Sequence, residues 1–383
     1  MNVNPFFLSA NIPDNYFCDR LKETEKLISL LLNGNNITLI SPRRMGKSGL
    51  INHVFSQQAI TKNFATVYID ILQTSSLREL TYLLGKAIYD NILPKTSKWI
   101  TKFFQIIKSI NGKLSFDPVT GYPSFNIMLA EMNNPLLTLE EIFEFIKSFN
   151  KPIIIAIDEF QQITRYPEGN TEALLRSYIQ QQNNTRFIFS GSERHIMQEM
   201  FTSYSRPFYN STSLISLEAI PKKEYVDFAL SNFTKEEKKI SSEAVEKLYD
   251  TFSGYTYYLQ KILNVAYSST PINQECNLKN IKDIGISILE ENSTIYREIL
   301  SNIPERQKEL LYAIAIEGKI EKIVSTEFIK KYNLLSASSV QSAARVLLEK
   351  DYITKLEGEY SLTDKFFSLW IKRIYGPSSS EFL

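Results

Sequence analysis

The chain has 383 residues, and its 43 Lys and Arg residues nearly balance its 42 Asp and Glu residues. The length predicts two or three domains with an ample core, and the small net charge argues against a protein coated in nucleic acid or bound to an anionic membrane. Two distant cysteines and two isolated histidines (Cys18, Cys276, His53 and His195) argue against a zinc site or a Ser-His-Asp triad and favour a reducing cytoplasm. No apolar run approaches the ~20 residues that span a bilayer, and the first residues do not resemble a signal peptide, so we expect no membrane partner.

The first half of the chain alternates predicted helices with predicted strands. Leucines repeat on one face of a helix within residues 14–33, and Gly34 ends it. Short apolar runs predict strands, which lie at 37–40, 66–70, 153–157, 186–192 and 211–220. Helical sequence lies at about 47–58, over most of 74–150 and at 171–182. This alternation indicates an α/β fold in which helices cover both faces of a parallel sheet.

The stretch ITLISPRRMGKSGL runs from a predicted strand through a tight loop into a helix. Residues 41–48 match the phosphate-binding pattern G-x-x-x-x-G-K-[ST], except that Ser41 stands at the first glycine. Backbone N–H groups of such a loop surround an anion at a helix N-terminus. Gly46 allows close approach, Lys47 reaches the β- and γ-phosphates, and Ser48 can bind Mg²⁺. The alternative is a basic loop that caps an ordinary helix.

The stretch KPIIIAIDE supplies a second motif, because its apolar run ends at Asp158 and Glu159. The run is typical of a buried central strand, where two carboxylates are costly without a nearby cation. In P-loop ATPases that cation is Mg²⁺, with the first acid on the metal side and the second orienting the attacking water. The alternative is that Asp158 only caps the next helix. Guanine-specific proteins usually carry Asn-Lys-x-Asp, whereas Asn150-Lys151 is followed by Pro152-Ile153, so we expect ATP.

The second half of the chain has a different pattern. After Pro221 it is helical and rich in charges to about residue 290. From residue 303 onward, a helix, a short helix, a longer helix and two short strands about Glu357-Gly358 predict a winged helix-turn-helix. We therefore expect three parts: a P-loop ATPase domain, a helical lid and a winged helix domain. Their predicted bounds are 1–220, 221–295 and 296–383, with a surface insertion near 95–135 whose loop or small hairpin lies at 111–126.

With these pieces in order, the chain resembles the archaeal-type ATPase family, in the STAND branch of the AAA+-like P-loop NTPases. It is most similar to the bacterial ATP-binding proteins of that family. The resemblance extends from about residue 5 to residue 375 and is weakest in the insertion. The segments that carry it are YFCDR (16–20), SPRRMGKS (41–48), IIIAIDEF (153–160), FIFSGS (187–192), SRPFYN (205–210) and SGYTYYLQ (253–260).

The resemblance implies roles for residues outside the two motifs. Tyr16, Phe17 and Asp19-Arg20 lie where relatives pack the N-terminal segment against the nucleotide base; the alternative is packing at a helix start. Ser190 and Ser192 lie where relatives place a residue that senses the γ-phosphate; the alternative is a turn. Arg206 lies where relatives carry an arginine near the nucleotide or facing a neighbouring subunit, and an arginine finger there would stabilise transition-state charge. The alternative for Arg206, and for the weaker candidate Arg194, is an ordinary solvated cation at the surface.

The chain also departs from the family pattern. Ser41 replaces a glycine, which costs little if the turn needs no positive φ. Gly254-Tyr255-Thr256 stands where relatives often have Gly-x-Pro or a histidine, which weakens the expectation that the lid senses the nucleotide. Tyr209-Asn210-Ser211 replaces a Tyr-Gly-Arg run, which leaves Arg206 as the arginine at this place.

The expected function is an Mg²⁺-dependent ATPase that works as a slow regulatory switch, with a protein partner or self-association. The alternatives are a DNA-associated ATPase that uses the winged helix, and a nucleotide-binding scaffold with negligible turnover. DNA binding is weakly supported, because residues 305–373 hold twelve Lys and Arg against ten Asp and Glu. The expected catalytic residues are Glu159, Lys47 and Arg206, and the expected metal ligands are Ser48 and Asp158. The expected nucleotide-binding residues are Ser41, Pro42, Arg43, Arg44, Met45, Gly46, Lys47, Ser48, Gly49, Tyr16, Phe17, Ser190 and Ser192.

Overall fold

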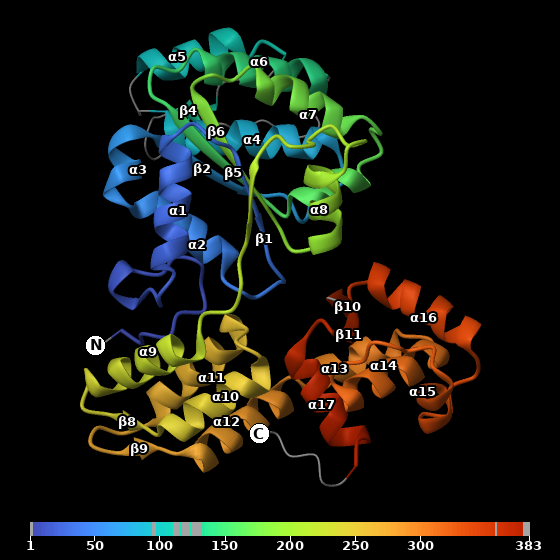
Figure 1. Cartoon of the computed structure of the whole chain (residues 1–383). Helices are drawn as coiled ribbons and strands as arrows, with labels where there is room; N and C mark the ends of the chain where they lie inside the picture. The colour runs from blue at the N-terminus through green and yellow to red at the C-terminus, as the bar shows by residue number, and fades with distance from the viewer. Residues whose placement is uncertain are drawn as a thin grey trace. The chain divides into compact units, whose positions relative to one another are not determined.

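The computed structural model describes residues 3–93, 97–109, 115–116, 123–124, 132, 134–356 and 358–377. The chain forms two compact units, one of residues Ser9–Ile220 and one of Met1–Leu8 with Pro221–Leu383. Figure 1 shows their elements. Within the expected insertion near 95–135, the structure describes α5 (Ser97–Ile106) and a short pair of strands, β3 (Ser115–Phe116) and β4 (Pro123–Ser124), while most of the expected loop at 111–126 lies outside the described residues.

A five-stranded sheet in the order β2-β5-β6-β1-β7 forms the centre of the first unit. All of its strand pairs are parallel, which confirms the predicted sheet. Every residue of β5 is buried, since this strand has neighbours on both sides and helices on both faces. The strands are β1 (Ile37–Ile40), β2 (Ala65–Asp70), β5 (Ile153–Asp158), β6 (Thr185–Gly191) and β7 (Ser213–Ser216).

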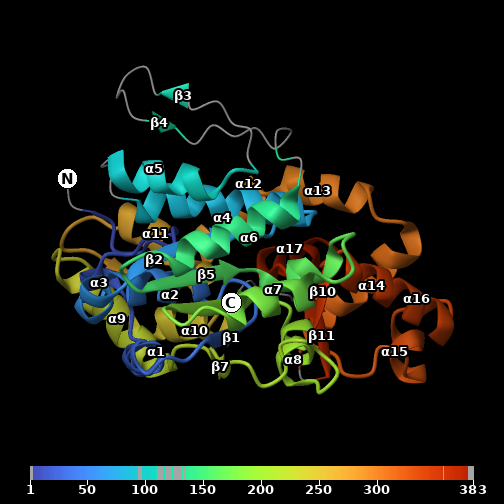
Figure 2. The same ribbon diagram turned by 90° about the horizontal axis from the view of Figure 1, so that it is seen from above.

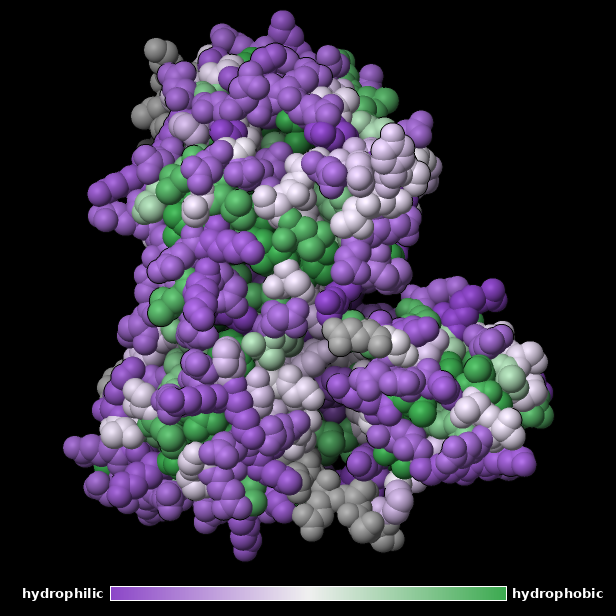
Figure 3. Space-filling model, in the orientation of Figure 1, coloured by the Kyte–Doolittle hydropathy of each residue, from purple (hydrophilic) through white to green (hydrophobic). Residues whose placement is uncertain are grey.

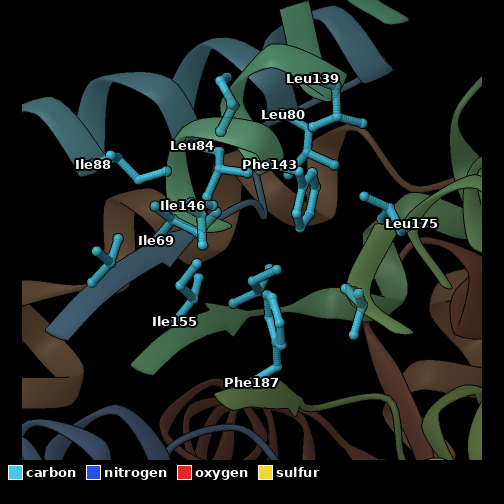
Figure 4. Packing of buried hydrophobic residues seen from close by; sticks show 14 of the residues in the cluster. Ile69, Leu80, Leu84, Ile88, Leu139, Phe143, Ile146, Ile155, Leu175 and Phe187 are labelled. Atoms are coloured by element: carbon cyan, nitrogen blue, oxygen red, sulfur yellow. The ribbon is translucent and has the colours of Figure 1, made fainter. Parts of the chain in front are cut away.

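Side chains alternate along the strands and fill a separate core on each face of the sheet. From β5, Ile154 and Ala156 join one core, whereas Ile153, Ile155 and Ile157 join the other. The first core is covered by α1 (Leu21–Leu32), α2 (Lys47–Ser56) and α3 (Gln58–Asn63). The second is covered by α4 (Leu77–Ile92), α5 (Ser97–Ile106), α6 (Pro135–Lys147), α7 (Thr171–Gln180) and α8 (Arg194–Thr202). In Figure 4, the α4 and α6 side chains Leu84 and Ile146 point toward the sheet residues Ile69 and Ile155.

The two helices predicted on either side of the first strand are present, and both are somewhat shorter than their predicted ranges. α1 starts at Leu21, because Asp19 and the N-cap residue Arg20 have left-handed φ values of 50° and 64°, and a short 3-10 helix, η1 (Asp14–Tyr16), lies before them. α2 ends at Ser56, where the extended Gln57 (φ −66°, ψ 139°) separates it from α3. The apolar pattern does not mark these ends, so periodicity alone does not locate them.

The second unit begins with a helical region and ends with a winged helix. The helical region contains α9 (Lys222–Thr234), α10 (Ser242–Phe252), α11 (Thr256–Ser269), α12 (Leu278–Glu291) and α13 (Ser293–Ser301), with a short parallel pair, β8 (Lys239–Ile240) and β9 (Glu275–Cys276). The predicted winged helix is confirmed: α14 (Glu305–Glu317), α15 (Thr326–Lys331), α16 (Ala337–Glu349), β10 (Ile353–Leu356), β11 (Glu359–Leu362) and α17 (Lys365–Tyr375) follow in that order. Figure 2 shows the same elements from another side.

A buried tyrosine joins the helical region to the winged helix within this unit. The Tyr258 hydroxyl of α11 accepts a hydrogen bond from the Lys365 backbone N–H (2.8 Å) and donates one to the Thr363 carbonyl (3.4 Å). Its ring stacks on Phe252 of α10 and meets the edge of Phe366 of α17. Because Tyr258 is fully buried, loss of its hydroxyl would leave the Lys365 N–H without this partner.

None of the described helices is long and apolar enough to cross a membrane. The face of the molecule in Figure 3 is mainly hydrophilic, with only separated apolar areas.

The first prediction concerns Lys365, whose ammonium donates to Ser361 Oγ (3.1 Å) and to the Leu362 carbonyl (3.2 Å). Burial, aided by the charge on Lys319 and opposed by Asp364, lowers the pKa of Lys365 from 10.5 to about 8. Between these values the unfolded chain binds more protons, so this group makes stability rise with pH from about 8 to 10.5. Lys365→Met should remove that rise.

The measurement is urea unfolding followed by the fluorescence of Trp370, in a Trp99→Phe background that leaves one tryptophan in the chain. Wild-type and Lys365→Met proteins should diverge as the pH increases through this window. Parallel stability profiles for the two proteins would contradict the prediction.

Candidate functional site

The loop between β1 and α2 forms a concave backbone turn at a helix N-terminus. Gly46 (φ 92°) occupies the N-cap position of α2, and Arg44 also has a left-handed φ of 68°. Alternation of right- and left-handed residues turns successive N–H groups toward one point, which suits an anion. Ser41 is fully buried, and its backbone N–H donates to the Gly191 carbonyl at 3.4 Å. Its φ is not positive, so a serine fits where the usual pattern has glycine.

Lys47 starts α2 and lies under the same loop. Its side chain is buried, and the ammonium donates to the carbonyl oxygens of Ser41 (3.2 Å) and Pro42 (3.5 Å). Burial lowers the pKa of Lys47, while the charges of Glu159 and Asp158 oppose this shift. An ammonium that is bonded to the carbonyl oxygens of such a loop can transfer its hydrogen bonds to phosphate oxygens.

Asp158 ends β5, and its carboxylate accepts hydrogen bonds from two other elements and from the next backbone N–H. Oδ2 accepts from Ser48 Oγ (2.7 Å) and from the Tyr68 hydroxyl (2.5 Å), and Oδ1 accepts from the Glu159 N–H (3.0 Å). Burial raises the pKa of Asp158, but the hydrogen bonds from Tyr68 and Ser48 and the charge of Lys47 outweigh it, so the pKa lies below its ordinary value. The carboxylate therefore stays ionised at neutral pH.

Ser48 and Asp158 together fit a magnesium ion. The Ser48 hydroxyl donates a hydrogen bond to Asp158, which leaves the lone pairs of Ser48 Oγ available to a cation. Hydroxyl and carboxylate oxygens are hard ligands, and Mg²⁺ is usually bound by one or two protein oxygens together with phosphates and water.

Glu159 follows in a left-handed conformation (φ 56°) and is held by two donors. Its Oε2 accepts from Gln161 Nε2 (2.6 Å) and from Ser192 Oγ (2.6 Å). Ser192 in turn accepts from Arg43 Nε of the loop (3.2 Å). Left-handed φ at a non-glycine residue costs of order 1–3 kcal/mol, and such strain is typical of functional sites. Arg43, Ser192 and Glu159 thus form one connected network.

The two serines after β6 have different surroundings. Ser190 is fully buried opposite Leu39 of β1, and its hydroxyl is one of the groups that lower the pKa of Asp158. Ser192 is partly buried and contacts Glu159. Ser190 therefore lies near Asp158, and Ser192 bonds Glu159.

The N-terminal segment packs along α2 and the loop. Phe17 stacks on His53 with ring centroids 3.9 Å apart and an interplanar angle of 8°, and Tyr16 immediately precedes it. The buried Arg20 donates to the Met45 carbonyl at 3.4 Å. At Gly49, an added Cβ would lie 3.7 Å from Ile12, which is ordinary packing distance. These residues support the loop.

The closest contacts of Arg206 are with acidic residues outside this site. Its guanidinium contacts Glu172 of α7 (2.5 Å) and Glu199 of α8 (3.6 Å). Burial raises the pKa of Glu172, and the charge of Arg206 opposes the shift. Arg194 begins α8.

Three residues of the site were missed in the sequence. Tyr68 and Asp70 lie two apart on β2, and Asp70 is opposite Asp158 in the parallel register. The predicted strand at 66–70 was a usable signal for both, because the carboxyl ends of parallel strands meet at one edge of a sheet. Gln161 carried no such signal, since it acts through a local turn rather than a motif.

Two family models match the chain. A model described as an ATPase domain predominantly from Archaea matches residues 17–262, and a probable winged helix domain matches residues 294–373. No curated protein matches the chain.

Solved structures show the same fold at low sequence identity. The Walker-type ATPase of Pyrococcus abyssi has a TM-score of 0.66 and 18% identity, with 96% of this chain and 99% of that chain covered. The Aeropyrum pernix ORC2 protein, in its ADPNP-ADP complexes, has a TM-score of 0.56 and 14% identity over 94% and 96%. The Aeropyrum pernix ORC1 protein in complex with DNA has a TM-score of 0.50 and 11% identity over 94% and 93%.

The second prediction concerns Gly191, which ends β6 beside the Glu159 network. A Cβ there would lie 2.4 Å from Gln161 Oε1 and 2.6 Å from Met197 Cγ, so both side chains must move. Gly191→Ala should lower the free energy of unfolding by about 1–3 kcal/mol, measured by urea unfolding. Gly169→Ala is the control, because a Cβ there has nothing within 4 Å. Equal stability of the two variants would contradict the close packing.

Proposed function

The chain belongs to the family of ATPase domains found predominantly in Archaea, and from this premise we propose that it is a slow, Mg²⁺-dependent ATPase of the STAND type that acts as a regulatory switch. The observation that carries the proposal is the cluster in which Ser48 bonds Asp158 (2.7 Å) while Glu159 follows at the end of the same strand. The buried Lys47 ammonium and the turn at Gly46 complete an anion site next to these acids.

Residues of this chain divide the proposed work between binding and catalysis. The backbone of residues 41–48 and Lys47 bind the phosphates, while Ser48 and Asp158 hold the magnesium ion, which when bound neutralises phosphate charge. Glu159 orients water for in-line attack on the γ-phosphate and accepts its proton. Phosphoryl transfer depends on positioning and charge stabilisation, so no nucleophilic Ser or Cys is needed. The left-handed backbone of Glu159 and the hydrogen bonds from Gln161 and Ser192 hold its carboxylate in one position.

The finer proposal of a slow switch rests on Arg206. Its guanidinium is engaged by Glu172 and Glu199, and neither is an acid of the nucleotide site. An isolated chain would then turn over slowly, because an arginine finger contributes about 10³–10⁵ in rate. We propose that a neighbouring copy or protein partner completes the site, and that Phe17, Tyr16 and Ser192 respond to the bound nucleotide.

The winged helix favours a second candidate, a DNA-associated ATPase, because the Aeropyrum pernix ORC1 structure contains DNA. Against it, the exposed face of α16 offers Arg345, which lies 3.9 Å from Glu349, and Lys350 follows the helix. A DNA reader normally presents a clustered basic face. We therefore propose that the winged helix docks a protein and that the chain works in the cytoplasm. Salt-sensitive binding to random duplex DNA would favour the alternative.

The third prediction tests hydrolysis. Glu159→Gln should lower phosphate release from Mg·ATP by at least about 100-fold, because it removes the general base, while ATP binding should persist. Glu25→Gln, at an exposed position on α1, is the matched control and should retain wild-type turnover. Indistinguishable rates for wild type and Glu159→Gln would overturn the hydrolytic role and favour a nucleotide-binding scaffold.

The fourth prediction tests the arginine. Specific ATPase activity should rise with protein concentration in the wild type, because a second copy supplies Arg206, and should stay low and flat in Arg206→Ala. Thermal unfolding of the variant checks that the loss of the Glu172 contact has not unfolded the unit. A flat, slow profile for the wild type would instead indicate a monomeric switch.

A further inference from the structure

Tyr68 lies on β2 with its hydroxyl against the metal-side acid. The hydroxyl donates to Asp158 Oδ2 at 2.5 Å, from a strand that pairs with β5 along its whole length. Neighbouring Val67 and Ile69 belong to the core on the opposite face, whereas Tyr68 packs with the core under α2. The pleat of β2 therefore directs Tyr68 to the face that carries the phosphate-binding loop.

The hydroxyl shares its acceptor with the proposed metal ligand. Ser48 Oγ also donates to Asp158 Oδ2, at 2.7 Å, so two hydroxyl groups from two elements fix one carboxylate oxygen. The ring of Tyr68 is half-buried, and its hydroxyl is the donor in this pair because a carboxylate oxygen can only accept.

We propose that Tyr68 is a positioning residue for the divalent cation: its hydroxyl holds the Asp158 carboxylate in the orientation that binds Mg²⁺. This inference rests on the proposed function of the same site. Groups that orient a metal ligand from outside typically contribute 10–100-fold to metal affinity or activity. Tyr68 acts through Asp158 and does not itself contact the nucleotide.

A purely structural role for Tyr68 predicts a different result. The aromatic ring packs against the core under α2, and this contact survives in Tyr68→Phe. A matched control is Tyr166→Phe, in the same unit: Tyr166 is buried, and its hydroxyl contacts Thr74 instead of a site residue. Both variants remove one tyrosine hydroxyl, but only Tyr68→Phe removes a donor to Asp158.

The experiment is calorimetric titration of a non-hydrolysable ATP analogue, with Mg²⁺ varied and with EDTA as the metal-free condition. Tyr68→Phe should need roughly 10–100-fold more Mg²⁺ for half-maximal enhancement of binding, and should match the wild type in EDTA. Tyr166→Phe should match the wild type in both conditions. In an Asp158→Asn background, Tyr68→Phe should cause no further change, because the two residues act as one unit.

Two outcomes would overturn the proposal and are distinguishable. If the wild type shows Mg²⁺-dependent binding and Tyr68→Phe shows the same dependence, the positioning role is wrong while the proposed function stands. If the wild type shows no Mg²⁺-dependent binding of the analogue, the proposed function is wrong, and so is this inference, which rests on it. Thermal unfolding of each variant separates a loss of fold from a loss of metal affinity.

Discussion

The site depends on one constraint, which is that the charge of Asp158 is buried at the end of the central strand β5. An ionised carboxylate is costly in such a place unless hydrogen bonds and opposite charge compensate for lost water. The compensation comes from Tyr68 of β2, Ser48 of α2 and the buried ammonium of Lys47. Satisfying this one group therefore fixes the position of the strand, the helix and the loop relative to each other.

The next residue along the chain is constrained from its other side. Glu159 adopts a left-handed backbone, and Phe160 then enters a buried aromatic cluster with Phe189 (centroids 4.5 Å apart) and Phe208 (5.4 Å). Phe208 belongs to the turn that also carries Arg206. The packing that holds Glu159 in its strained conformation is thus the packing that anchors this turn, so a partner that displaced the turn would also disturb Glu159.

Much of the fold could be predicted from the sequence, but only part of the site. Apolar runs marked β1 and β5, and the order of strands and helices implied the parallel sheet, because strand burial leaves a direct pattern in composition. The Tyr68–Asp158 contact joins residues 90 positions apart, and nothing in either short segment encodes it. Likewise, the left-handed φ of Arg20, the N-cap residue of α1, has no counterpart in the apolar repeat, which begins at Leu21. Long-range pairing and backbone strain are set by the assembled structure.

Within the second unit, a buried tyrosine ties the helical region to the winged helix. Ser253 and Gly254 turn the chain with left-handed φ values of 50° and 72° between α10 and α11, and Tyr258 one turn later bonds the start of α17. Because that hydroxyl is buried and its ring lies between Phe252 and Phe366, displacement of α11 against the winged helix would leave buried polar groups unpaired. The helical region and the winged helix are therefore joined by an interaction that is costly to break.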